Sequence, residues 1–93
     1  MKVLVNNKFG GFRIKDEVIK KVMGEDACFA SDDVLRVNAE LIAMKERGED
    51  IEDNVSDLIV VEVPKGATDW KVFDYDGMES LYAVVDGKIV YCG

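Results

Sequence analysis

The sequence predicts one α+β domain over residues 1–93, a small mixed or antiparallel sheet of about four to five strands with two short helices packed on one face. Residues 58–63 form an apolar, β-branched run that Pro64 ends, which is typical of a strand buried on both faces. Two other segments have helical periodicity, and the last third of the chain alternates between strand and turn residues. With 93 residues, of which 48% are hydrophobic, the chain is large enough for one core.

The first strand is expected at residues 2–5, beside the run at 58–63. A turn follows at residues 6–12, where Gly10 and Gly11 allow backbone angles that are closed to other residues. We expect the two flanking rings, Phe9 and Phe12, to hold this turn against the core.

Residues 16–23 predict the first helix, which Gly24 ends. Residues 25–37 are expected to be irregular, with residues 27–30 tucked under the core. Asn38 is the predicted cap of the second helix, which continues to Gly48. An earlier start, with Ser31 or Asp32 as the cap, is the alternative.

The region after Pro64 predicts a meander that ends in a hairpin. Residues 75–78 form a turn, and Asp86-Gly87 is a strong signal for a two-residue hairpin turn. Its register places Tyr82 opposite Tyr91 on one face of the sheet and aliphatic side chains on the other face. We expect the helices to cover the aliphatic face.

Tyr82 and Tyr91, joined by Ser80 and a neighbouring ring, would then form a half-exposed aromatic surface of the kind found at protein interfaces. The alternative is that the two tyrosines pack on a loop or on each other.

The net charge of −7 is unevenly distributed, because residues 1–24 carry six basic and two acidic side chains and the remainder holds −11. Such an acidic surface repels nucleic-acid phosphates and anionic membranes, and it favours a basic protein partner. Residues 49–57 contain five acids and no base, so they form either a solvated loop or an acidic finger for that partner. The finger would present Glu49, Asp50, Glu52 and Asp53.

The absence of histidine removes the usual general base and the partner that activates serine or cysteine nucleophiles, so no enzymatic activity and no cofactor are expected. Cys28 and Cys92 are expected to be free thiols in a reducing compartment. Asp74, Asp76 and Glu79 form either a site for a hard cation or a turn whose aspartates bond their own backbone.

The Gly10-Gly11 turn offers a second possible site. Backbone amides ahead of a helix, with Lys8, Arg13 and Lys15 nearby, are suited to a phosphate group and thus to a bound nucleotide. The alternative is a purely structural turn.

No apolar stretch approaches the length of a membrane span or a signal peptide, so we expect a cytoplasmic protein. Its oligomeric state, monomer or homodimer, is left open, since an exposed last strand at residues 88–92 could pair edge to edge across a two-fold axis.

The order of short motifs, Gly10-Gly11-Phe12 before a short helix and Tyr75-Asp76-Gly77 before a terminal hairpin, resembles that of small proteins encoded by tailed phages and prophages. Lys15 and Ala39 stand where those proteins often carry serine and proline. The resemblance implies a viral accessory protein in a bacterial cytoplasm, of a kind that often acts against host defence, as anti-CRISPR proteins and nucleotide sponges do.

These observations and the resemblance predict a non-enzymatic phage or prophage protein that binds and inhibits a host protein, such as a component of a defence system, through its acidic surface. A nucleotide-binding sponge that uses the Gly10-Gly11 turn is the alternative function.

Overall fold

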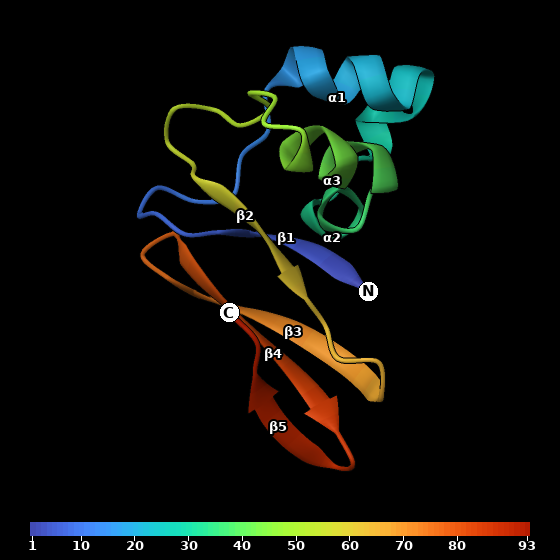
Figure 1. The fold of residues 1–93 in the computed structure, drawn as a ribbon. Coiled ribbons are helices and arrows are strands. Elements are labelled where there is room, and N and C mark those ends of the chain that lie inside the picture. The colour runs from blue at the N-terminus through green and yellow to red at the C-terminus, as the bar shows by residue number, and fades with distance from the viewer.

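The computed structural model describes all 93 residues and has an α+β fold, as the sequence predicts (Figure 1). The elements in chain order are β1 (Lys2–Asn6), α1 (Asp16–Met23), the 3-10 helix η1 (Gly24–Phe29), α2 (Asp32–Arg36), α3 (Ala39–Glu46), β2 (Leu58–Glu62), β3 (Ala67–Tyr75), β4 (Met78–Val85) and β5 (Lys88–Tyr91). None of the helices is long and apolar enough to cross a membrane.

All strand pairs are antiparallel, and the strands are divided between two sheets. Strands β1 and β2 pair from Lys2 opposite Glu62 to Asn6 opposite Leu58, which confirms that the first strand lies beside the apolar run. The second sheet has the order β3-β4-β5.

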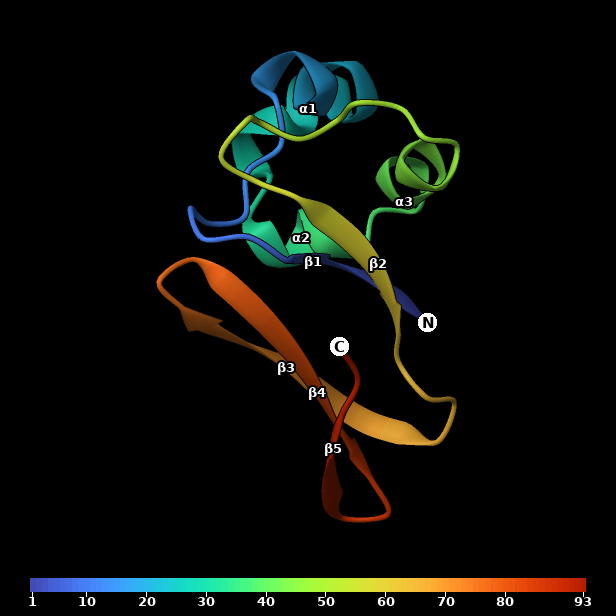
Figure 2. The same ribbon diagram turned by 60° about the vertical axis from the view of Figure 1, so that its left-hand side comes forward.

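The β1–β2 pair lies between the helices and the three-stranded sheet, so the molecule has three layers (Figures 1 and 2). Alternation along β1 points Leu4 towards the helices, whereas Val3 and Val5 point towards the second sheet. In β2, Leu58 packs with the helices and Val61 packs against the second sheet. Because the strand is covered on both faces, side chains of either orientation leave water, and apolar residues at consecutive positions are favoured. This explains the continuous apolar run.

This arrangement corrects one expectation. The helices do not cover the aliphatic face of β4; instead Leu81 and Ala83 pack against β1 and β2. The physical reason is that the two-stranded layer is apolar on both sides, so the helices bury one side and the three-stranded sheet buries the other.

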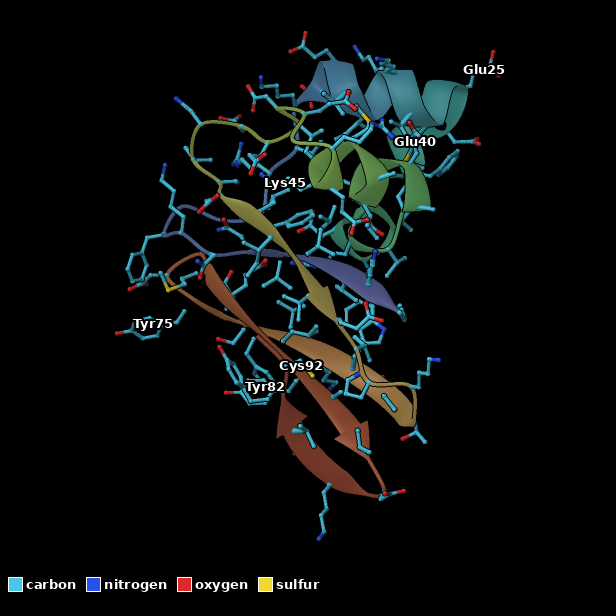
Figure 3. The ribbon with its side chains drawn as sticks, in the orientation of Figure 1. Glu25, Glu40, Lys45, Tyr75, Tyr82 and Cys92 are labelled. Atoms are coloured by element: carbon cyan, nitrogen blue, oxygen red, sulfur yellow. The ribbon has the colours of Figure 1, made fainter.

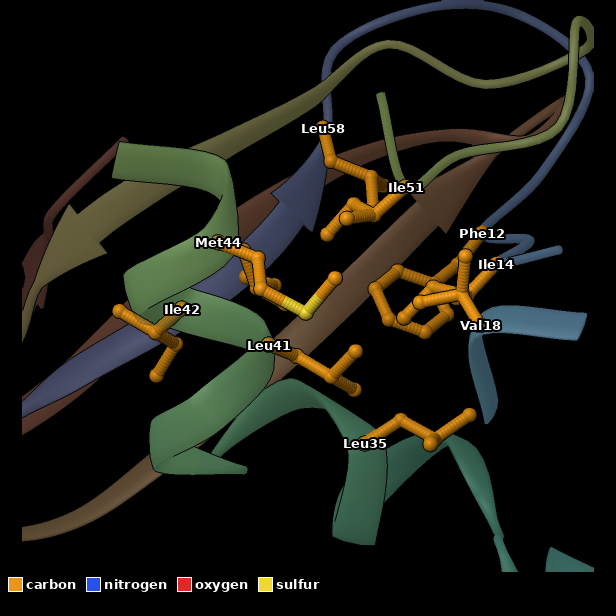
Figure 4. Packing of buried hydrophobic residues seen from close by; sticks show 10 residues of the cluster. Phe12, Ile14, Val18, Leu35, Leu41, Ile42, Met44, Ile51 and Leu58 are labelled. Atoms are coloured by element: carbon orange, nitrogen blue, oxygen red, sulfur yellow. The ribbon is translucent and has the colours of Figure 1, made fainter. Parts of the chain in front are cut away.

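The helical side of the core is built from α1, α2, α3 and the loops that cross them (Figure 4). Asn38 begins α3 as predicted, because its side-chain oxygen accepts a hydrogen bond from the Leu41 amide at 3.0 Å. Ser31 caps a separate short helix, α2, through the amide of Val34 at 3.3 Å. The expectation of irregular structure at residues 25–37 is therefore wrong, since η1 and α2 occupy this segment.

Two further expectations about burial fail in part. Within residues 27–30 only Ala30 packs against the core, whereas Cys28 is exposed and Phe29 is 76% exposed, because η1 lies at the periphery. In the glycine turn Phe12 is buried, but Phe9 is 56% exposed and does not hold the turn to the core. Both cysteines are free.

Candidate protein-binding surface

Two tight turns set the register of the three-stranded sheet. Asp76 and Asp86 have φ angles of 51° and 52°, and the glycines that follow them have φ angles of 90° and 75°. Two consecutive positive φ angles match the twist of an antiparallel hairpin, which explains the Asp-Gly sequences. The second turn places Tyr82 opposite Tyr91, as predicted from the sequence.

The outer face of this sheet carries three rings in contact with one another. Phe73 and Tyr82 meet edge to face with their centroids 5.3 Å apart, and Tyr82 and Tyr91 are 5.4 Å apart at 61°. Phe73 is the neighbouring ring that the sequence did not identify. It lies opposite Ser80 and therefore diagonal to Tyr82, within reach of its ring.

We call this surface the aromatic face; it consists of Phe73, Tyr75, Tyr82, Ile89 and Tyr91. Four of these side chains are largely in water, with exposed fractions of 58% for Phe73, 75% for Tyr75, 76% for Ile89 and 64% for Tyr91. In Figure 3 Tyr75 and Tyr82 project from the same side of the sheet, where no other element lies over them.

A hollow of about 390 Å³ opens on the aromatic face. Its lining is mostly apolar and consists of Phe73, Asp74, Tyr75, Met78, Ser80, Tyr82 and Ile89. Isolated exposed apolar residues are ordinary on protein surfaces, but a contiguous group that surrounds a hollow is typical of an interaction site.

The acidic segment is packed against the rest of the molecule. Ile51 is fully buried, and Ile14 and Glu52 form an isolated antiparallel bridge. The Lys15 amide donates a hydrogen bond to the Ile51 carbonyl at 3.0 Å, and the Asp53 amide donates one to the Arg13 carbonyl at 3.1 Å. These bonds hold residues 51–53 against residues 13–15, which directly precede α1.

Three of the four predicted finger carboxylates are paired within the chain. Glu49 accepts a hydrogen bond from Arg47 at 2.7 Å, and Asp50 accepts one from Lys15 at 2.7 Å. The hydrogen bond and charge of Lys15 lower the pKa of Asp50 below its usual value, while the hydrogen bond to Asp50 raises the pKa of Lys15.

Glu52 is structural. Its carboxylate accepts two hydrogen bonds from Lys45 Nζ, at 2.7 and 2.9 Å, and one from the Leu58 amide at 2.7 Å. Its side chain is only 10% exposed. Of the four acids, Asp53 alone forms no ion pair.

A second group of acids, which the sequence did not bring together, lines a cleft of about 620 Å³ between α2 and β3. Asp32 and Asp33 come from α2 and Asp69 and Asp74 come from β3, and Trp70 and the basic Lys71 also line the cleft. Because the two elements are separated by more than thirty residues, no local pattern signals this cleft.

At the base of the cleft, Arg36 and Glu79 form a buried ion pair with side chains 6% and 4% exposed. The two terminal guanidinium nitrogens of Arg36, Nη1 and Nη2, donate to the Glu79 carboxylate, and Nη1 also donates to the Leu4 carbonyl at 3.1 Å. Glu79 accepts a further hydrogen bond from the backbone amide of Asn6 at 2.8 Å. The guanidinium carbon lies 4.2 Å from the centre of the Phe12 ring. The pair thus joins α2, β1 and β4.

Two of the three basic residues near the Gly10-Gly11 turn have partners within the chain. Lys8 Nζ donates to the Asn54 carbonyl at 2.9 Å, and Lys15 is paired with Asp50. The backbone of the turn lies close to Gly77, since a Cβ added at Gly77 would lie 2.4 Å from the nitrogen of Gly11. The first turn of α1 is acidic, which opposes a phosphate there.

The carboxylates of the Asp74 to Glu79 region also have internal partners. Asp74 Oδ1 accepts the Gly77 amide at 2.7 Å, which is the aspartate turn that the sequence offered as the alternative to a cation site. Glu79 is bound to Arg36. No group of three or more carboxylate, cysteine or histidine residues in the molecule is arranged to hold a metal ion.

Compared with known proteins, the chain matches no family model, no curated protein and no solved structure.

Proposed function

We propose that this protein is a non-enzymatic binding protein whose aromatic face docks on another protein. The observation that carries the proposal is that one face of the β3-β4-β5 sheet is covered by β1 and β2, while the opposite face presents contiguous rings to water. Tyrosine and phenylalanine supply large contact area at low entropic cost, and such residues dominate binding energy at protein interfaces.

The charge distribution supports a basic partner. The five side chains of the aromatic face are uncharged, with Asp74 at the edge of its hollow and Lys71 opposite Tyr82. The chain as a whole has a net charge of −7, and the cleft beside this face gathers four aspartates and one lysine. An acidic surround speeds association with a cationic surface, and an uncharged centre avoids the cost of burying unpaired charge. The cleft acids take the steering role that the sequence assigned to residues 49–53, whose carboxylates are mostly paired within the chain.

The proposal includes no chemical step. The chain has no histidine, and its two carboxylates that are largely buried beside a base are both bonded within the fold, Glu79 to Arg36 and the Asn6 backbone amide, and Glu52 to Lys45 and the Leu58 amide. On the resemblance to phage proteins, the proposed partner is a host protein of a bacterial cytoplasm that this protein inhibits by occupying its surface.

The proposal is tested by retention of partners on immobilised protein. The full chain, a Tyr75→Ser/Tyr91→Ser variant and a Phe9→Ser/Phe29→Ser variant are incubated with the same bacterial lysate and eluted for mass spectrometry. The two variants are matched, because each removes two exposed rings, but only the first removes them from the aromatic face. We expect a protein retained by the full chain and the second variant and lost from the first. Equal retention by all three would contradict the proposal.

A further inference from the structure

Strand β5 is a short, exposed sheet edge. It is the last strand in the order β3-β4-β5, and all four of its residues are exposed. Natural proteins usually limit pairing at such an edge by keeping the strand very short, or with a proline, a bulge, charges such as lysine, or a covering segment. Strand β5 has four residues and lacks a proline and a covering segment. Here the only charged residue in the strand is Lys88, and the pairing of β5 with β4 is regular.

The hairpin register decides which backbone groups of β5 are free. In a two-residue hairpin the closing pair, Val85 and Lys88, exchanges hydrogen bonds, and every second pair after it does the same. Val90 and Cys92 therefore point their amides towards β4, and the bond from the Cys92 amide to the Leu81 carbonyl at 2.8 Å agrees with this alternation. The amides and carbonyls of Ile89 and Tyr91 consequently point away from the sheet.

We propose that β5 pairs antiparallel with β5 of a second copy of this chain, across a two-fold axis at Val90. In this register Ile89 lies opposite Tyr91 of the second copy and exchanges backbone hydrogen bonds with it. By symmetry the seam contains about four such bonds. Each Tyr91 ring meets an Ile89 side chain of the second copy on the same face, a favourable aromatic and β-branched pair.

The local charge permits a second copy despite the net charge of −7. No acid lies in β5, and the two Lys88 side chains are about 13 Å apart along the seam, since they are offset by about four residues at about 3.3 Å each. This separation exceeds the Debye length of about 8 Å at physiological salt, so their repulsion is screened. A strand from another protein with a basic residue opposite Lys88 would instead place two like charges within the Debye length, where they repel.

The seam is short, so the dimer is weak. Pairing of four-residue strands buries less than the roughly 800 Å² per partner of a standard interface. Association should therefore depend on concentration over the micromolar to millimolar range. The dimer would join the three-stranded sheets of both copies and their aromatic faces into one continuous surface.

Sedimentation equilibrium tests the seam. The full chain is expected to approach twice the protomer mass as its concentration rises from about 10 µM to about 1 mM, which is the range of weak interfaces. Ile89→Pro removes an outward amide and leaves the amides that bond β4, so it should stay monomeric and folded by circular dichroism. Ile89→Val keeps the amide and should dimerise like the parent. A parent that is monomeric throughout, or an Ile89→Pro variant that dimerises equally, would overturn the proposal.

A crosslink tests the register. In a chain with Cys28→Ser and Cys92→Ser, Val90→Cys places two thiols directly opposite at the axis, with Cα atoms about 4.5 Å apart. This spacing allows a disulfide. Tyr91→Cys places its thiols about 8 Å apart by Cα, beyond the reach of a disulfide. With dissolved oxygen as the oxidant, we expect a covalent dimer only from the Val90 variant. Equal crosslinking of both variants, or of neither, would refute this register.

The inference stands apart from the proposed function, because neither experiment needs a partner protein. A monomer that still loses its partner on Tyr75→Ser/Tyr91→Ser would refute the seam alone.

Discussion

Replacing Arg36 with methionine should lower the free energy of unfolding by about 3–5 kcal/mol, because it leaves the buried Glu79 carboxylate without its counter-charge. The Glu79 side chain is 4% exposed, so water cannot replace the lost guanidinium. The Asn6 amide is its one remaining donor. The Leu4 carbonyl and the Phe12 ring also lose their contacts with the guanidinium. A loss of this size is a large part of the 5–15 kcal/mol typical of a domain.

Urea unfolding followed by circular dichroism measures the effect. Arg47→Met is the matched control, because Arg47 makes two ion pairs in water with a 55% exposed side chain, and its loss should cost less than about 1 kcal/mol. The double variant Arg36→Met/Glu79→Met should be more stable than Arg36→Met alone, since removing both charges leaves chiefly the Asn6 amide unsatisfied, at about 1–3 kcal/mol. Additive losses in the double variant, or an Arg36→Met cost below about 1 kcal/mol, would refute this reasoning.

Three other predictions concern the acidic segment and the turns. Glu52→Gln should cost about 1.5–3 kcal/mol in urea unfolding, because its charge-assisted bonds are mostly buried, whereas Glu49→Gln should change little. Gly77→Ala should cost well over the roughly 1–2 kcal/mol of a left-handed alanine, because its Cβ would clash with backbone, whereas Gly87→Ala should cost only that amount. The pKa of Asp50, measured by NMR of its carboxyl group, should lie below that of an ordinary aspartate, and replacing Lys15 with methionine should raise it.

The sign of the Asp50 effect on stability follows from its lowered pKa. The folded state binds this proton less readily than the unfolded state, so the contribution is present above the ordinary aspartate pKa and is lost as the pH falls through the lowered value. A midpoint at or above the ordinary value would contradict the Lys15 contact. Equal losses of unfolding free energy for Glu52→Gln and Glu49→Gln would contradict the structural role of the buried Glu52 carboxylate. Equal losses for Gly77→Ala and Gly87→Ala would contradict the close backbone contact at Gly77.

Local patterns in the sequence predict much of this fold. The β-branched run at residues 58–63, the Asn38 cap and the Asp86-Gly87 turn each signal one local conformation, and all three elements occur in the structure. The hairpin turn also predicts that Tyr82 lies opposite Tyr91. These features depend on neighbouring residues, which is why they can be read along the chain.

Features that depend on distant residues escape such reading. The strands divide into two sheets because Leu81 and Ala83 pack against β1 and β2. The residues around Leu81 and Ala83 show only that this face of β4 is buried, and they do not show whether a helix or a second sheet buries it. The pairing of Lys15 with Asp50 joins residues far apart in sequence and neutralises one of the four carboxylates of the predicted acidic finger. Phe73 could have been assigned to the aromatic face, because the Asp76-Gly77 turn fixes its register against β4.

The most direct test of the binding account is hydrogen–deuterium exchange of the full chain, free and bound to the partner retained in the lysate experiment. Docking through the aromatic face predicts slower exchange on binding in residues 73–91, with residues 49–57 unchanged. Slower exchange in residues 49–57 or in the helices, with residues 73–91 unaffected, would contradict docking through the aromatic face.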